Sequence, residues 1–201
     1  RWNEEYALVL KYLAGEGKQK TGDLVNALTL AENAVRMYAQ ARDNTLPEIV
    51  DKDTIENRLL RTMGIASTIA TGLARLTTGE MQTQYQRRAV GYAQQEVTDR
   101  RLVLYETGGD ALANAYHTLG VAQSELAAGN ELAYTDAKQN ISKAFKLSPE
   151  NPMLLTVLTF RFAWLEYVAH PENRESIGIY VDKVLDEQGP MGEGRWVKAD
   201  G

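Results

Sequence analysis

The sequence predicts an all-α protein, and three observations support this class. Apolar residues recur at the three- and four-residue spacing of amphipathic helices along most of the chain. No segment shows a persuasive strand or hairpin signal. The helical segments are joined mostly by short turns, which favours antiparallel pairs of neighbouring helices.

The composition is that of a soluble protein and narrows the possible functions. The 201 residues suffice for one domain with a sizeable core, and 44% are hydrophobic against 24% charged. The net charge of −5 gives no support for nucleic-acid binding. No cysteine is present, which excludes disulfides, thiolate metal sites and cysteine nucleophiles. No apolar run is long enough for a transmembrane segment.

The compartment, the organism and the oligomeric state are not given by the sequence. The chain starts at Arg1 rather than Met, so either a leader was removed or this is a fragment boundary. We favour a bacterial periplasmic or lipid-anchored location, with the cytoplasm as the alternative.

The first two predicted helices lie before Pro47. Residues 6–13 carry one apolar stripe, and the loop 15–22 follows it. The second helix begins at Asp23 and ends before Pro47, because proline disfavours helical geometry in the residue preceding it. The apolar stripe of this second helix consists of Leu24, Ala27, Leu28, Ala31, Ala34, Val35 and Tyr38.

Two long helices are predicted next, over residues 53–77 and 80–106. Asp53 and Glu56 resemble a capping box at the start of the first, and Gly79 interrupts the pattern between them. The predicted inward positions of the first helix are Ile55, Leu59, Met63, Ala66, Ile69, Ala70, Leu73 and Leu76. Those of the second are Tyr85, Ala89, Tyr92, Ala93, Val97 and Leu104.

Four further helices are predicted over residues 111–128, 134–147, 153–169 and 173–187. A Gly-rich tail, residues 189–201, ends the chain.

The segment 111–151 carries the pattern of a helical repeat. An aromatic residue and Leu-Gly come first, and two alanines and a proline follow in the second helix. The positions concerned are Tyr116, Leu119, Gly120, Ala137, Ile141, Ala144 and Pro149. The pattern resembles the tetratricopeptide repeat (TPR), with Gln123 in place of its second aromatic residue and Ile141 in place of its phenylalanine. The turn 129–136 is expected to be longer than the family's tight turn.

The resemblance implies a right-handed α-solenoid of about four antiparallel helix pairs, hence about eight helices, in one domain over residues 1–188. The pairs would cover residues 2–42, 53–106, 110–148 and 152–188, and all but the third diverge from the family pattern. A different up-down helical bundle is the alternative.

Sites for chemistry are mostly excluded by their surroundings. The segment 15–22 lacks the first glycine, the final Ser/Thr and the preceding strand of a phosphate-binding loop. The two histidines, His117 and His170, do not form the paired Glu-x-x-His pattern of a di-iron bundle. We therefore expect no enzyme activity, no cofactor and no metal.

The solenoid implied by the resemblance has a concave groove lined by the first helix of each pair. We expect Asn114, His117, Val121 and Glu125 to line this groove, with Leu119 and Ala122 facing the partner helix. In the last pair, Phe160, Trp164 and Tyr167 fall on the groove side, where aromatic residues can anchor a ligand or where the tail could cover them. Some TPR domains bind the C-terminal carboxylate of a peptide through a carboxylate clamp. His117 and Val121 at the corresponding positions argue against such a clamp here.

A non-catalytic scaffold that binds a protein or peptide in this groove is the first hypothesis. The alternatives are a small-molecule-binding accessory protein, similar to the TPR-like periplasmic partners of solute transporters, and a helical enzyme. Fold alone carries function only by analogy.

Overall fold

The computed structural model describes residues 20–44, 52–102, 109–148, 161–167, 169, 170 and 172. Five helices lie in these ranges: α2 (Lys20–Asn44), α3 (Lys52–Leu76), α4 (Gly79–Leu102), α5 (Gly109–Ser124) and α6 (Glu131–Leu147). Residues 161–167 form a further helical stretch, called helix 161–167 below, and the described ranges contain no strand. The protein is therefore all-α, as the sequence predicts.

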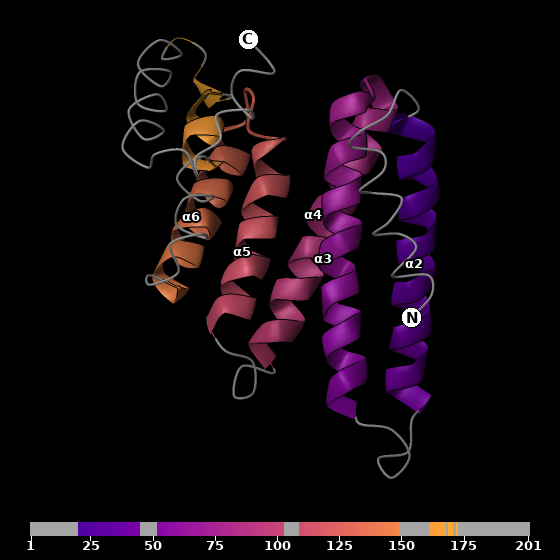
Figure 1. The fold of residues 1–201 in the computed structure, drawn as a ribbon. Helices are drawn as coiled ribbons and strands as arrows, with labels where there is room; N and C mark the ends of the chain where they lie inside the picture. Colours follow the sequence, from indigo (N-terminus) through magenta and orange to yellow (C-terminus); the bar gives the residue numbers. More distant parts are fainter. Residues whose placement is uncertain are drawn as a thin grey trace, which may run out of the picture.

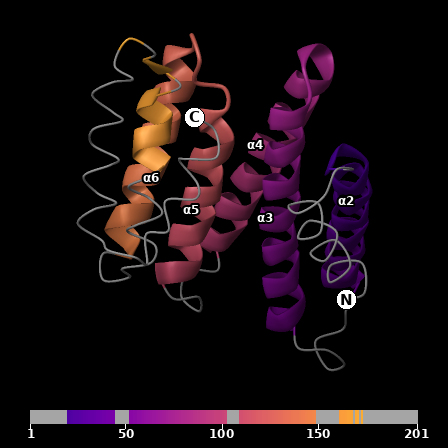
Figure 2. The same ribbon diagram turned by 45° about the horizontal axis from the view of Figure 1, so that its top comes forward.

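The helices pack against one another in chain order. α2 packs on α3, α3 on α4, α4 on α5 and α5 on α6, and both views of the fold show this succession (Figures 1 and 2). α5 also touches α3. α5 consequently lies where three other helices meet. None of the helices that are described is long and apolar enough to cross a membrane.

Small residues bring α2, α3 and α4 close together in the first core cluster. The large side chains that are almost completely buried there are Leu28, Ile69 and Leu73. The helices can approach one another closely because small residues lie between them, namely Ala27, Ala31, Ala66 and Ala70. Gly79 takes a φ of 65°, a left-handed conformation that suits glycine, at the turn from α3 into α4. The inward stripes predicted for these helices are thus largely confirmed.

The contact between α5 and α6 is the tightest point of the predicted repeat. A Cβ atom on Gly120 would lie 2.6 Å from Ile141 Cγ1 and 3.3 Å from the carbonyl oxygen of Ala137. Gln123 Oε1 accepts a hydrogen bond of 2.7 Å from Asn140 Nδ2 across the same interface. The residue that departs from the family's second aromatic therefore joins the two helices by a polar contact.

The other repeat positions that the structure describes are also in this core. They are almost fully excluded from solvent: Tyr116, Leu119, Ala137, Ile141 and Ala144. Ala122 is buried as well, so the predicted inward face of α5 is confirmed. Pro149 lies outside the described residues.

Several predicted helix boundaries are wrong. α2 begins at Lys20, so the end of the expected loop 15–22 belongs to the helix. α5 ends at Ser124 rather than at residue 128, because the chain closes turns there through Leu126 N to Gln123 O and Ala127 N to Ser124 O.

α6 begins earlier than predicted because Asn130 caps it. The Asn130 side chain accepts a hydrogen bond of 3.2 Å from the backbone N–H of Ala133. The helix starts at Glu131, so the expected turn over residues 129–136 is shorter than predicted. At the end of α3, the predicted inward residue Leu76 is 47% exposed.

The remaining predicted elements cannot be compared with the fold. The expected helices 6–13 and 173–187, residues 153–160 of the expected helix 153–169, and the tail 189–201 lie outside the described residues.

Candidate functional site

The predicted groove residues of α5 lie at a spacing of three and four positions. This spacing places Asn114, His117 and Val121 on one face of the helix, and Glu125 follows in the turn after Ser124. Asn114 is exposed, whereas the other three are partly buried. This α5 face therefore passes from an open polar end to a more enclosed end near Glu125.

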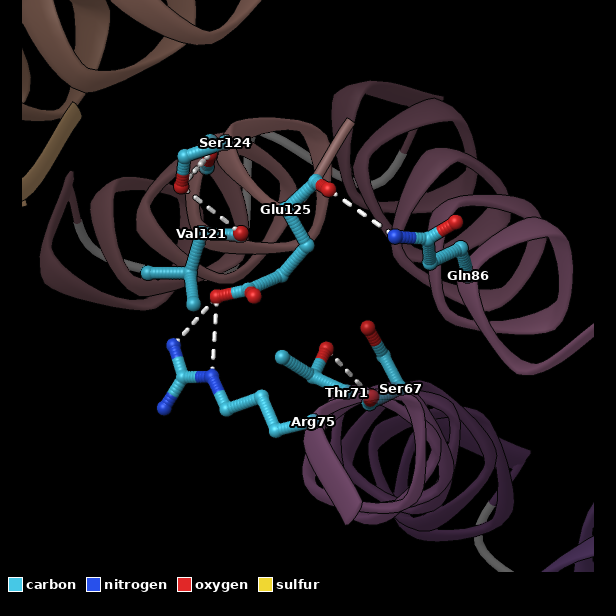
Figure 3. A network of polar contacts seen from close by, with 8 residues as sticks. Ser67, Thr71, Arg75, Gln86, Val121, Ser124 and Glu125 are labelled. Atoms are coloured by element: carbon cyan, nitrogen blue, oxygen red, sulfur yellow. Dashed lines mark hydrogen bonds and ion pairs between the residues drawn. The ribbon is translucent and has the colours of Figure 1, made fainter. Parts of the chain in front are cut away.

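Glu125 ties the end of α5 to α3 and α4. Its Oε1 accepts a hydrogen bond of 2.9 Å from Arg75 Nε and a second one from the same guanidinium. Its backbone carbonyl accepts a hydrogen bond of 2.9 Å from Gln86 Nε2 on α4. Figure 3 shows Arg75 and Gln86 reaching Glu125 from two different helices. The end of this face is consequently held by three elements at once.

The α3 helix facing Glu125 satisfies its own buried hydroxyl groups. Thr71 donates a hydrogen bond of 3.0 Å to the carbonyl oxygen of Ser67 (Figure 3). The Ser67 hydroxyl donates one of 2.8 Å to the carbonyl oxygen of Ala89 on α4. These hydroxyl groups have a structural role in the packing of α3 on α4.

Arg75 also links the α5 face to helix 161–167. Its guanidinium carbon lies 5.9 Å from the centroid of the Trp164 ring. Trp164 stacks on Tyr167 with centroids 5.7 Å apart and an interplanar angle of 20°. Both aromatic side chains are 37% exposed, so this pair offers a partly open apolar surface beside the arginine.

Helix 161–167 is anchored to α6 by apolar and polar contacts. Leu165 is completely buried, and Phe162 stacks on Phe145 of α6 with centroids 5.6 Å apart. Tyr134 donates a hydrogen bond of 2.6 Å to Glu166 Oε1, which also accepts one of 3.2 Å from Lys138. Phe145 of α6 therefore contacts helix 161–167 directly.

The charges in this anchor favour ionised Glu166. Burial alone would raise the pKa of Glu166, but the hydrogen bonds from Tyr134 and Lys138 outweigh burial and lower it. The Tyr134 ring also meets His170 edge-on, with centroids 5.0 Å apart. These contacts fix the position of the exposed Trp164 and Tyr167 relative to α5.

His117 lies in the enclosed part of the α5 face. Its Nε2 atom is buried and has no hydrogen-bond partner in the part of the chain that the structure describes. Burial, assisted by the positive charge of Arg161, lowers the pKa of His117 from 6.5 to about 4. His117 is therefore neutral at physiological pH.

Arg161 is the second unusual group near this face. Burial and then the positive charge of Arg75 lower the pKa of Arg161, whereas Glu125 opposes this effect. The guanidinium remains charged, because arginine is not deprotonated in proteins at ordinary pH. Arg161 and Arg75 are thus two cations that share one nearby carboxylate.

The structure brings together most of the predicted site residues and adds three that sequence reasoning missed. Phe160 lies outside the described residues, so its predicted place is not compared. The missed residues are Arg75, Gln86 and Arg161. The signal for Arg161 was readable: it is the first charged residue in the largely apolar stretch that begins at Met153.

The described ranges contain no group of three or more His, Asp or Glu side chains placed to hold a metal ion. Comparison with protein-family models, curated proteins and solved structures gave no match for this chain. Function is therefore inferred from the geometry of the α5 face and of helix 161–167.

Proposed function

We propose that this protein is a non-catalytic interaction scaffold, a TPR-like α-solenoid that binds a peptide segment of a partner protein. The binding surface consists of the α5 face (Asn114, His117, Val121 and Glu125) together with Trp164 and Tyr167. A larger solenoid of helix pairs is consistent with the contact of α5 with both α3 and α6.

The observation that carries this proposal is the exposed Trp164–Tyr167 pair beside the polar α5 face. Large aromatic side chains are the commonest anchors in protein interfaces, because they bury much area at low entropic cost. The anchoring of helix 161–167 through Leu165 and Phe162 holds these rings in place before any partner binds, which reduces the cost of binding.

A peptide selection tests the proposal without a known partner. Peptides selected from a random library on the whole chain are measured for affinity by fluorescence anisotropy, with the wild type and three variants. Trp164→Ala and Val121→Asp should each weaken binding at least about tenfold, the loss expected of an interface anchor.

Met37→Ala is the matched control for these variants. Met37 is 59% exposed on α2, and α2 does not touch α5 within the described helices. Selected peptides that bind all variants equally would contradict the proposed surface, as would a library that yields no specific peptide.

A small-molecule-binding accessory role is the second candidate function. The observation that favours it is the buried Nε2 of His117, a polar atom left unpartnered by the described residues beside the charged Arg161. Such enclosed polar atoms orient small ligands in binding sites. A thermal-shift screen of metabolites separates the two functions, since a ligand that binds only the native state raises its apparent stability.

A further inference from the structure

Arg161 is a partly buried cation without a polar partner among the residues that the structure describes. Within those ranges its guanidinium makes no hydrogen bond and no ion pair, although an arginine has five N–H donors. Arg100, which is also enclosed, instead donates a 2.9 Å hydrogen bond to Glu96. An enclosed charge that makes no direct ion pair and shares its nearest carboxylate with another cation destabilises the fold, so a second contribution is needed to explain Arg161.

The charges around Arg161 leave one positive charge over. Arg75 and Arg161 contribute two positive charges, and Glu125 contributes one negative charge. The Oε1 atom of Glu125 already accepts two hydrogen bonds from the guanidinium of Arg75. His117 is neutral and adds no charge. The cluster therefore matches an anion that carries a single charge.

His117 adds an unfilled hydrogen-bonding position to the same cluster. Its Nε2 is buried without a partner in the described ranges, and its imidazole is near enough to Arg161 to respond to that charge. Burying a polar atom without a hydrogen-bond partner is unfavourable, so native structures usually satisfy such atoms. A ligand oxygen lying between His117 and Arg161 would satisfy both groups.

We propose that Arg161, Arg75 and His117 bind a ligand carboxylate, with the adjoining part of the ligand lying on Trp164 and Tyr167. The planar guanidinium of arginine matches the two oxygens of a carboxylate. A phosphate monoester carries up to two negative charges and would meet Glu125, which disfavours it. This assignment deepens the proposed function, since it names the chemical group that the binding surface recognises.

The source of the carboxylate is an acidic side chain of a peptide, the C-terminus of a peptide, or a small organic acid. All three present the same group, and the aromatic pair beside Arg75 favours a source with an apolar group next to the carboxylate. The probes below separate the three sources.

Calorimetric titration of the whole chain with N-acetylphenylalanine tests the proposal. The neutral amide of the same compound and phenyl phosphate are the comparison ligands. The wild type should bind the carboxylate at least about tenfold more tightly than either of them. Equal binding of carboxylate and amide, or binding of neither, would overturn the assignment.

Arg161→Gln should abolish this preference, whereas Arg87→Gln should keep it. Arg87 is exposed on α4 and is a matched loss of one arginine charge. Because Arg161 makes no direct ion pair with a described residue and shares Glu125 with Arg75, its removal should leave the melting temperature unchanged or raise it. If Arg161 served the packing alone, Arg161→Gln would lower the melting temperature and retain the carboxylate preference.

A variant that keeps the charge covers the case in which Arg161→Gln does not fold. Arg161→Lys retains one cation but not the planar fork, so it should bind the carboxylate more weakly than the wild type while remaining folded. Wild-type affinity in Arg161→Lys would contradict recognition by the guanidinium.

The imidazole of His117 provides a readout that a packing role would not move. A carboxylate bound beside His117 favours its protonated form, so saturation with the ligand should raise the pKa of His117 measured by NMR. The His170 signal serves as the internal reference. An unchanged pKa of His117 at saturation would refute contact between the carboxylate and this residue.

Two peptides identify the source and keep this test separate from the proposed function. One carries an internal glutamate and an amidated C-terminus, and the other carries glutamine and a free C-terminus. Arg161-dependent binding of N-acetylphenylalanine with no peptide binding would retain the carboxylate site and reject the peptide scaffold. Peptide binding that depends on Trp164 but not on Arg161 would retain the peptide scaffold and reject the carboxylate site.

Discussion

Substitution of His117 tests whether this residue is held neutral inside the fold. Its pKa falls from 6.5 to about 4 on folding, so the unfolded chain takes up a proton between these values and the folded chain does not. The free energy of unfolding is therefore unaffected by His117 well above pH 6.5 and decreases as the pH falls toward 4.

The size of this effect follows from the two pKa values. Integration of the proton uptake gives a loss of about 1–2 kcal/mol between about pH 7 and pH 5, the lower figure allowing for solvent near this partly buried side chain. His117→Gln removes the titrating group, so its free energy of unfolding should decrease less than that of the wild type over the same interval.

Urea unfolding followed by circular dichroism at several pH values provides the measurement. Both proteins carry His170→Gln, so that His117 is the remaining histidine and all carboxylates cancel in the comparison. The difference in unfolding free energy between the two proteins should change steadily between about pH 6.5 and 5. A difference that stays constant with pH would refute the buried, neutral state of His117.

Three further predictions concern the packing that positions the site. Gly120→Ala should destabilise the protein by about 1–3 kcal/mol in urea unfolding, because its Cβ would lie 2.6 Å from Ile141 Cγ1. The control Gly91→Ala, whose Cβ would have nothing within 4 Å, should stabilise the protein by up to about 1 kcal/mol. Equal effects of the two substitutions would contradict the close contact at Gly120. Burial raises the pKa of Glu96 despite its ion pair with Arg100, so the wild type should lose stability relative to Glu96→Gln as the pH rises above 4.5. If the free energies of unfolding of the two proteins changed in parallel with pH, the raised pKa of Glu96 would be contradicted. Leu165→Ala should lower the free energy of unfolding by about 2–5 kcal/mol and also weaken peptide binding, because this completely buried side chain anchors helix 161–167. A decrease below about 1 kcal/mol would show that other contacts hold this helix.

The sequence predicts the long helices well because their signals are local. The expected starts of α3 and α4 differ from the structure by one residue each, since apolar periodicity and Gly79 mark them. The small residues of the repeat pattern also predict a real close contact, as the position of Gly120 against Ile141 shows.

The errors arise where local signals compete. Residues 126–128, after Glu125, are apolar, and Ala127 is buried, so the apolar pattern continues through a stretch in which the backbone already turns. Asn130, a favoured capping residue, marks the start of α6, whereas the apolar stripe alone places that start at Tyr134.

The candidate site depends on contacts that no local pattern encodes. Arg75 and Glu125 are 50 positions apart in the chain and meet only because α5 packs against α3. The pKa of His117 is likewise lowered by burial in the fold and by the charge of Arg161 from a separate helix. The sequence therefore predicts the residues on one face of the site. The way in which the charges of the site meet depends on the folded arrangement of the helices.

Chemical-shift mapping of bound N-acetylphenylalanine tests the proposed binding surface most directly. We expect backbone signals of residues 114–125 and 161–167 to shift together with the ring signals of Trp164, and signals around Met37 on α2 to stay in place. Shifts centred on another surface, or an absence of shifts at a ligand concentration that saturates the calorimetric signal, would contradict a binding surface formed by α5 and helix 161–167.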